Sequence, residues 1–308
     1  MPARGRILVF GSLNTDVVQR VTRLPRAGET VHGADLATFT GGKGANQSCA
    51  AARLGGRAFM AGIVGEDSFG AALLADLQAL GVDVALVGRS PRKTGTATIL
   101  VLPDGDNAIV LSPGANADVG AALAAQAVAG LTHGDCLLCQ LEVPLQATHA
   151  ALCLARARGV CTILDPAPAG ELPDELLQHV DILTPNQTEA STLLDWKSPV
   201  ATLDEARAAA DALRTRGARN VIVKLGALGC LVSSSSDSVH VPAVSGEVID
   251  TTAAGDTFNG ALAVSLQEGR ELVEAARFAV CAASLSVRRR GAIASIPSRS
   301  EVDAMLRS

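Results

Sequence analysis

The sequence predicts an α/β fold, with a mainly parallel central sheet covered by helices on both faces. Short apolar runs alternate with stretches of helical periodicity almost throughout the chain, which is the pattern of βα units. Composition agrees, because 48% of the residues are hydrophobic, 30 are glycine and only 2% are aromatic. A chain of 308 residues can bury one large core, so we expect a single domain over residues 1–308.

The expected strands and helices follow one another in regular order. The strands are short apolar runs, at Ile7–Phe10, Ala58–Val64, Val84–Gly88, Cys136–Leu141, Cys161–Leu164, Ile182–Thr184 and Val221–Leu225. The clearest amphipathic stretches lie between them, at Ala45–Leu54, Phe69–Leu80, Leu145–Arg158 and Leu203–Arg216. Ligands of such folds bind at the carboxyl ends of the strands, where we expect the site.

Two segments break this alternation and predict a small β-sheet lid. Residues 16–40 form a polar, β-branched stretch between the first strand and its helix. Residues 94–112 alternate apolar and polar side chains around Asp104-Gly105, which is a strong hairpin signal. We expect the two segments to pair over the site, with ordinary surface hairpins as the alternative. A further hairpin at Cys230–Val241 is expected at the periphery.

Charge and cysteine content exclude several classes of protein. The net charge is −5 and no basic patch with interleaved aromatics occurs, which argues against nucleic acid as a partner. The first apolar run is too short for a signal peptide, and no run reaches the length of a membrane span, so we expect a cytoplasmic protein. The seven cysteines lie mostly in apolar runs and are expected in the core, and the Arg288–Arg290 run is expected to be solvated or locally structural.

Two glycine-rich helix starts, Gly41–Asn46 and Ala253–Phe258, are the most informative motifs. Each is expected to leave backbone N–H groups bare at the first turn of an apolar helix, where hydroxyls and anions bind. The second also carries Asp256, and a carboxylate beside an anion hole suits transfer of a phosphoryl group onto a hydroxyl. The sequence therefore predicts a small-molecule kinase. Gly41–Asn46 is not a P-loop, because Ala37 and Gly44 stand where that motif needs Gly and Ser or Thr.

Six stretches together resemble the PfkB-type family of sugar kinases, also called the ribokinase family. They are Gly11–Asp16, Pro25–Thr30, Gly41–Gln47, Asp165–Ala169, Thr184–Ala190 and Asp250–Gly260, in the family's order over nearly the whole chain. The resemblance implies a ribokinase-like three-layer fold in which the small sheet is a lid. It also implies ATP-dependent phosphorylation of D-ribose at the 5-hydroxyl, which gives ribose 5-phosphate.

The resemblance assigns roles to residues at the sugar end of the expected site. Asp256 is expected to be the general base, kept ionised by its place in the first turn of a helix. The anion hole would be formed by the backbone of Ala253, Ala254, Gly255 and Asp256. Sugar binding is implied for Asn14, Thr15, Asp16, Gly42, Lys43, Gly44, Ala45, Asn46, Glu142 and Asp256.

At the nucleotide end, the resemblance implies ATP and two cations. ATP contacts are expected from Asn186, Lys224, Leu225, Gly226, Ala227, Leu228, Gly229, Gly255 and Asp256. Mg²⁺ would be held by Asn186 and Glu189 through water, a capping box being the alternative explanation of this pair. A monovalent cation, K⁺, would be held by Asp250, Thr252, Ser286, Arg289, Gly291 and Ser295.

Three positions depart from the commonest pattern of the family. Lys224 stands where Thr is frequent, Asp165 where Asn is frequent, and Val280 where a polar neighbour of adenine is often found. All three lie toward the nucleotide or the metal, so they bear on the phosphoryl donor and not on the sugar. A homodimer through the lid strands is also implied, with Thr96–Val110 as a plausible pairing edge.

Other functions are weighed against ribose phosphorylation. The alternative acceptors are another pentose, deoxyribose or a nucleoside; against a nucleoside, Phe39 is the only aromatic residue of the expected lid on which a base could stack. A non-catalytic sugar sensor on the same fold would have no use for the intact Ala254-Gly255-Asp256. A dehydrogenase is disfavoured because no dinucleotide fingerprint occurs.

Overall fold

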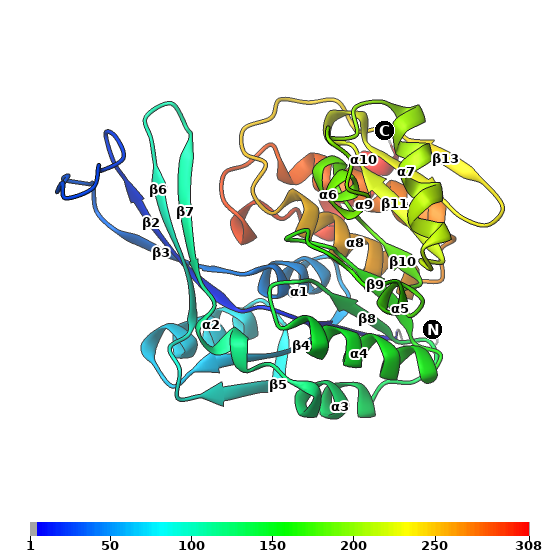
Figure 1. The fold of residues 1–308 in the computed structure, drawn as a ribbon, viewed down its shortest axis with the longest axis horizontal. Helices are drawn as coiled ribbons and strands as arrows, with labels where there is room; N and C mark the ends of the chain where they lie inside the picture. The colour runs from blue at the N-terminus through cyan, green and yellow to red at the C-terminus, as the bar shows by residue number, and fades with distance from the viewer. Residues whose placement is uncertain (1–4, 308) are drawn as a thin grey trace.

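A nine-stranded sheet forms the centre of the protein in its computed structural model, which describes residues 5–307 (Figure 1). The strand order is β13-β12-β11-β10-β9-β8-β1-β4-β5; the strands from β11 to β5 run parallel, and β12 and β13 are antiparallel. Their bounds are β1 Arg6–Phe10, β4 Arg57–Gly65, β5 Asp83–Ser90, β8 Cys136–Cys139, β9 Cys161–Leu164, β10 Ile182–Leu183, β11 Asn220–Lys224, β12 Cys230–Ser233 and β13 Ser238–Val241.

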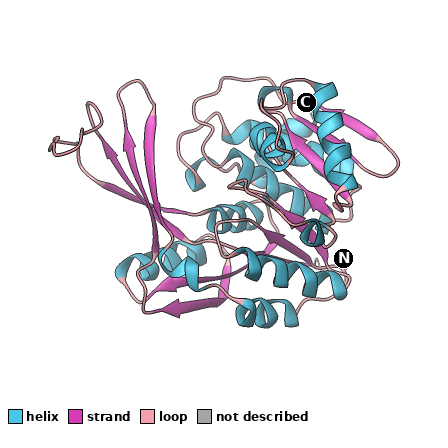
Figure 2. Cartoon of the chain, viewed as in Figure 1, coloured by secondary structure: helices cyan, strands magenta, loops and turns pink. Residues whose placement is uncertain are grey.

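Helices cover both faces of this sheet and complete three layers (Figure 2). Successive side chains of β1 point to opposite faces, so Ile7 and Val9 enter one core while Leu8 and Phe10 enter the other. The first core is covered by α1 Lys43–Arg53, α2 Ser68–Ala79, α8 Ala254–Gln267, α9 Leu272–Ser286 and α10 Arg299–Arg307. The second is covered by α3 Ala121–Ala129, α4 Leu145–Ala157, α5 Asp174–Leu177, α6 Gln187–Leu193 and α7 Leu203–Thr215.

A separate four-stranded sheet stands out from the rest of the molecule, at the left of Figure 1. Its order is β3-β2-β6-β7, with bounds β2 Asn14–Arg20, β3 Ala37–Gly41, β6 Gly95–Val101 and β7 Asn107–Ser112. The two predicted insertions meet where β2 pairs parallel with β6, from Asn14 opposite Gly95 onward. The prediction of a mainly parallel α/β fold with a second small sheet is therefore confirmed.

The predicted elements differ from the observed ones mainly at their ends. The strand predicted to reach Leu141 ends at Cys139, and β10 is only two residues long. The third hairpin forms β12 and β13, which lie at the edge of the large sheet as expected. Cys136 and Cys139 are buried free thiols in β8, so their prediction as core residues is confirmed. Among residues 5–307, no helix has the length and apolarity needed to cross a bilayer.

Candidate active site

Two helices from distant parts of the sequence meet at the carboxyl edge of the large sheet. Asn46 Nδ2 on α1 donates to Asp256 Oδ2 on α8 at 2.9 Å, across 210 residues of sequence. Gln47 Nε2, the next side chain along α1, donates to Asp256 Oδ1, also at 2.9 Å. The two glycine-rich helix starts therefore adjoin a single carboxylate.

The start of α1 differs from the prediction, because its N–H groups are already occupied. Lys43 N donates to Glu142 Oε2 at 3.1 Å, and Ala45 N donates to the Ser12 carbonyl at 3.1 Å. Gly44 N reaches Ser12 Oγ at 3.4 Å, and the Ser12 hydroxyl itself donates to Glu142. The prediction that the backbone N–H groups at this helix start lack hydrogen-bond partners is therefore wrong. The N–H groups of Lys43, Gly44 and Ala45 instead hold α1 against Ser12 and Glu142.

The start of α8 is open, as predicted. Ala253 precedes the helix in the left-handed conformation, with φ of 57°. Ala254 N donates to the Thr251 carbonyl at 3.2 Å, whereas the N–H groups of Gly255 and Asp256 find no acceptor among residues 5–307. An unoccupied pair of N–H groups at the positive end of a helix dipole is suited to an anion. Of the four residues predicted for the anion hole, Ala254 thus has its N–H group engaged.

The electrostatics of Asp256 are dominated by burial. The residue is 5% exposed, and desolvation raises the pKa of its carboxyl, while Lys43 and the hydrogen bond from Asn46 act in the opposite direction. The pKa shift is therefore opposite to the one expected from the helix dipole alone. A raised pKa makes the ionised carboxylate a stronger acceptor for a hydroxyl proton.

Of the predicted sugar residues of β2, Asp16 lies near enough to Asp256 for their charges to repel. Asn14 and Asp16 share one face of the strand, and Asn14 Oδ1 accepts from Asn116 Nδ2 at 2.7 Å. Asn116 Oδ1 in turn accepts from Leu13 N at 2.9 Å, so this buried amide fixes Asn14. The sequence analysis missed Asn116, because nothing in the local pattern of its 3₁₀ turn, Gly114–Asp118, points to a partner 102 residues away.

Thr15 and Asn46 illustrate two different outcomes for predicted sugar residues. Strand alternation turns the Thr15 side chain to the face opposite Asn14, so only its backbone is available to a ligand beside Asn14. Asn46 Oδ1, in contrast, is buried without a hydrogen-bond partner among the described residues. An orphaned buried acceptor is costly unless a ligand satisfies it, and a sugar hydroxyl is a suitable donor.

Asp16 and Lys43, two charged residues near Asp256, also have shifted pKa values. Burial, followed by repulsion from Glu142 and Asp256, raises the pKa of Asp16 to about 6. Burial acts against the charged form of Lys43, but the surrounding carboxylates, those of Asp256 and Asp165 foremost, raise its pKa above the ordinary value. Three carboxylates, of Asp16, Glu142 and Asp256, thus lie close to one another and to Lys43. Such a cluster of charged groups with shifted pKa values is typical of a functional site.

A pocket of about 810 Å³ is lined by Asp256 and Lys43. Of the residues predicted to contact ATP, those that line it are Asn186, Lys224, Gly226, Ala227, Gly229, Gly255 and Asp256. Two do not. Leu225 is 2% exposed in the core, and Leu228 projects outward at 45% exposure. The sequence analysis anticipated Val280 but missed the other apolar lining, formed by Ala243, Val244, Val248, Phe258, Ala283 and Val287.

Asn186 and Glu189 form a capping box at the start of α6. Asn186 N donates to Glu189 Oε2 at 2.7 Å, and Glu189 N donates to Asn186 Oδ1 at 2.8 Å. Burial raises the pKa of Glu189, and Lys224 opposes that rise. Both residues line the pocket, and each carboxylate oxygen retains a lone pair, so the pair fits a hydrated Mg²⁺ as well as a helix cap.

The residues predicted for a monovalent cation come from two segments that the structure joins. Asp250 Oδ1 accepts from Thr252 N at 2.9 Å, and its Oδ2 accepts from Gly291 N at 2.8 Å. These bonds hold the pKa of Asp250 below its usual value, although burial opposes the shift. The described residues contain no group of three His, Cys, Asp or Glu side chains that could hold a metal, so a cation here would be held by the single carboxylate of Asp250 together with carbonyl and hydroxyl oxygens. Such a donor set fits K⁺ better than a transition metal.

The basic run beside this loop is structural, as expected. Arg288 Nη2 donates to the Ser245 carbonyl at 2.8 Å, and Arg289 pairs with Glu301.

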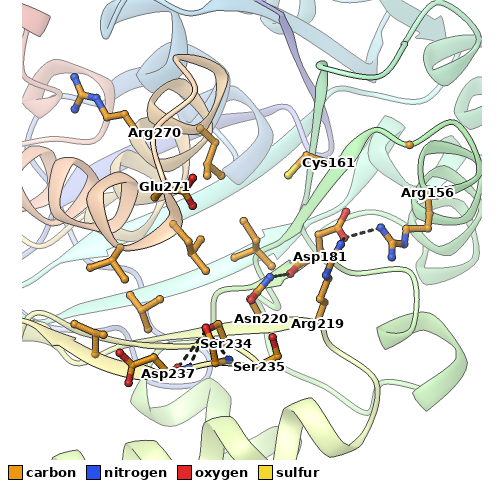
Figure 3. A pocket seen from close by; sticks show the side chains of 18 residues that line it. Arg156, Cys161, Asp181, Arg219, Asn220, Ser234, Ser235, Asp237, Arg270 and Glu271 are labelled. Atoms are coloured by element: carbon orange, nitrogen blue, oxygen red, sulfur yellow. Dashed lines mark hydrogen bonds and ion pairs between the residues drawn. The ribbon is translucent and has the colours of Figure 1, made fainter.

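A second pocket, of about 690 Å³, lies at the opposite, amino edge of the sheet (Figure 3). Its arginines are matched by acids: Asp181 Oδ1 lies 2.7 Å from Arg156 Nη1 and 3.6 Å from Arg219 Nη1. Arg270, across the pocket from Asp181, contacts Glu268 at 3.4 Å. Because these three arginines already have acidic partners, the pocket offers an anion no free arginine among residues 5–307.

Comparison with known proteins agrees with this geometry. The family model described as pfkB family carbohydrate kinase matches residues 4–299. Ribokinase of Bacillus subtilis is 42% identical over 97% of this chain and 99% of its own, and that of Haemophilus influenzae is 40% identical over 97% of each. The structure of Arabidopsis thaliana ribokinase complexed with ribose and ATP is 33% identical, with a TM-score of 0.90 over 99% of this chain and 100% of its own. The chain therefore belongs to the pfkB family of carbohydrate kinases.

Proposed function

We propose that the protein transfers the terminal phosphoryl group of ATP to the 5-hydroxyl of D-ribose, giving ribose 5-phosphate and ADP. The observation that carries this proposal is the position of Asp256. Its carboxylate lies at an open helix start, accepts hydrogen bonds from Asn46 and Gln47 of α1, and lines the 810 Å³ pocket. Similarity to a ribokinase complexed with ribose and ATP supports both substrates.

In the proposed reaction, Asp256 accepts the proton of the 5-hydroxyl while the hydroxyl oxygen attacks the terminal phosphorus. The bond from phosphorus to the bridging oxygen breaks, and its electron pair leaves with ADP. The N–H groups of Gly255 and Asp256 bind the transferring phosphoryl oxygens. Because catalysis of phosphoryl transfer is mainly positioning and charge stabilisation, these fixed donors and the buried base are its main requirements.

Ribose would be bound by the carboxylate and amide groups around Asp256. The carboxylates of Asp16 and Glu142 would accept hydrogen bonds from ribose hydroxyls, and Asn46 Oδ1, which has no partner among the described residues, would accept a further one. Asn116 donates to Asn14 Oδ1 and so fixes the Asn14 side chain, which would also contact ribose. A site built from such acceptors discriminates strongly against analogues that lack a hydroxyl, because a buried acceptor is then left unpaired.

Two cations would assist. Glu189 and Asn186 would hold Mg²⁺ through water, and the ion would supply positive charge to neutralise the phosphates. K⁺ would be held by Asp250, Thr252, Ser286, Arg289, Gly291 and Ser295, and would order the loop that leads into α8.

The second sheet would act as a lid on a single domain over residues 1–308, and as the contact of a homodimer. β7 is an outer strand of this sheet and exposes Ile109, Val110 and Leu111 at 51–67%. Exposed apolar side chains on an edge strand favour pairing with a second copy.

The test is ADP production from ATP and Mg²⁺ in the presence of K⁺, across ribose, deoxyribose, arabinose, xylose, fructose, adenosine and inosine. We expect a clear preference for ribose. Preference for another acceptor would retain the kinase but overturn the sugar assignment. Sugar binding without ADP production would instead identify a sensor.

A further inference from the structure

Lys224 and Asp165, two of the three residues that depart from the family's commonest pattern, form a buried ion pair. Lys224 Nζ at the end of β11 lies 2.9 Å from Asp165 Oδ1, beyond the end of β9. The pair passes over β10, which lies between those strands. The side chains are only 13% and 1% exposed, so each charge is compensated mainly by its direct partner, with Lys43 near Asp165 and Glu189 near Lys224 as further charges.

Asp165 continues this contact to the proposed base. Its Oδ2 accepts from Gln47 Nε2 at 2.9 Å, and the same Nε2 donates to Asp256 Oδ1 at 2.9 Å. Gln47 Oε1 accepts from Gln140 Nε2 at 2.6 Å, which fixes the orientation of the amide. Lys224, Asp165, Gln47 and Asp256 are thus one hydrogen-bonded series.

The ammonium group of Lys224 also faces the proposed anion hole. A Cβ atom built on Gly255 would lie 3.4 Å from Lys224 Nζ, so the group lies beside the open first turn of α8. Lys224 lines the same pocket as Ala253, Gly255 and Asp256. An ammonium has three N–H donors, and Asp165 engages one of them.

We propose that Lys224 is a catalytic residue whose ammonium binds the transferring phosphoryl group opposite the N–H groups of α8, and that Asp165 is the positioning residue that holds it there. This inference rests on the proposed kinase function and adds a charged group to it. Lys224 neither gives nor takes a proton in the transfer, which leaves the balance of bonds unchanged. It stabilises charge on the non-bridging oxygens, a task for which a lysine is well suited.

The test needs a double variant, because K224T alone leaves the buried Asp165 carboxylate unpaired and lowers stability. K224T/D165N replaces the ion pair with neutral side chains. We expect K224T to lower kcat about 100-fold, the range for loss of one charge-stabilising donor. The double variant should regain the wild-type Tm and keep the low kcat. K197T, at an exposed lysine, is the matched control and should match the wild type.

If K224T/D165N has the Tm and the kcat of the wild type, the ion pair has only a structural role and the proposal is overturned. A second measurement does not depend on the sugar: the affinities of the same variants for ADP and for a non-hydrolysable ATP analogue. Loss of Lys224 should weaken binding of the ATP analogue and spare ADP, and equal weakening of both would also overturn the proposal. Should the wild type phosphorylate no sugar, the proposed function fails, while this comparison still decides the phosphate contact.

Discussion

The two glycine-rich helix starts resemble each other in sequence and differ in what their backbone does. At α1, Lys43 N, Gly44 N and Ala45 N all have acceptors in Ser12 or Glu142. At α8, the N–H groups of Gly255 and Asp256 have none among the described residues. The backbone of the first start is therefore used to anchor the helix, whereas the second start leaves two N–H groups available to a ligand. A glycine-rich motif by itself does not distinguish these two uses.

The largest effect should come from the open start at α8. We expect D256N to lower kcat by about 10²- to 10⁴-fold, the usual contribution of a positioned base. Ribose should still bind, because the amide keeps the shape of the side chain. Steady-state kinetics with ribose binding by calorimetry would test this, and near-wild-type turnover would remove Asp256 from its assigned role.

On the side of α1, the effect should appear in sugar affinity. D16A removes an acceptor for ribose hydroxyls, and hydrogen bonds to charged groups contribute about 1.5–3 kcal/mol, so KM for ribose should rise about 10- to 100-fold. D204A is a control, since the Asp204 side chain is 94% exposed. An unchanged KM in D16A would contradict the proposed hydroxyl contacts.

The same carboxylate should make ribose binding depend on pH. The pKa of Asp16 is raised to about 6, so the group is protonated below that value and ionised above it. Since the ionised form accepts the sugar hydroxyls, ribose affinity should fall about tenfold from about pH 7 to about pH 5. In D16N this step should vanish; a step that persists there would belong to another group.

Replacing the monovalent cation should affect kcat, which depends on the start of α8, but not ribose affinity, which depends on the start of α1. Exchanging K⁺ for tetramethylammonium at constant ionic strength should lower kcat several-fold, because the Asp250–Thr252 loop leads into α8. Ribose affinity, which depends on the side of α1, should hardly change. D250A should be insensitive to the exchange. Equal wild-type activity with both cations would dispose of the proposed cation site.

The smallest effect is expected from S12A, which loosens the start of α1. Loss of the hydroxyl removes the contacts to Glu142 and Gly44 N, at a cost of about 0.5–1.5 kcal/mol. The Tm should fall by about 1–4 °C with kcat unchanged. A large loss of kcat at constant Tm would mean that α1, like α8, acts directly in the reaction.

The sequence by itself determined the fold class, the order of the elements and the candidate base. Alternating apolar runs and helical periodicity are local properties, and they located strands such as β1 and helices such as α4 to within a residue or two. Asp256 was identifiable because its glycine-rich context is contained in six adjacent residues. The resemblance to a family then supplied the remaining expected residues.

Only the tertiary structure decided which groups are satisfied and which are free. Gln47 and Asp256 are 209 residues apart, and Asn14 and Asn116 are 102 apart, so no local pattern could pair them. The same holds for the occupied N–H groups of α1, whose acceptors come from the end of β1 and the loop after β8. Hydrogen-bond satisfaction depends on what packing brings within about 3 Å, and packing joins segments that the sequence keeps apart.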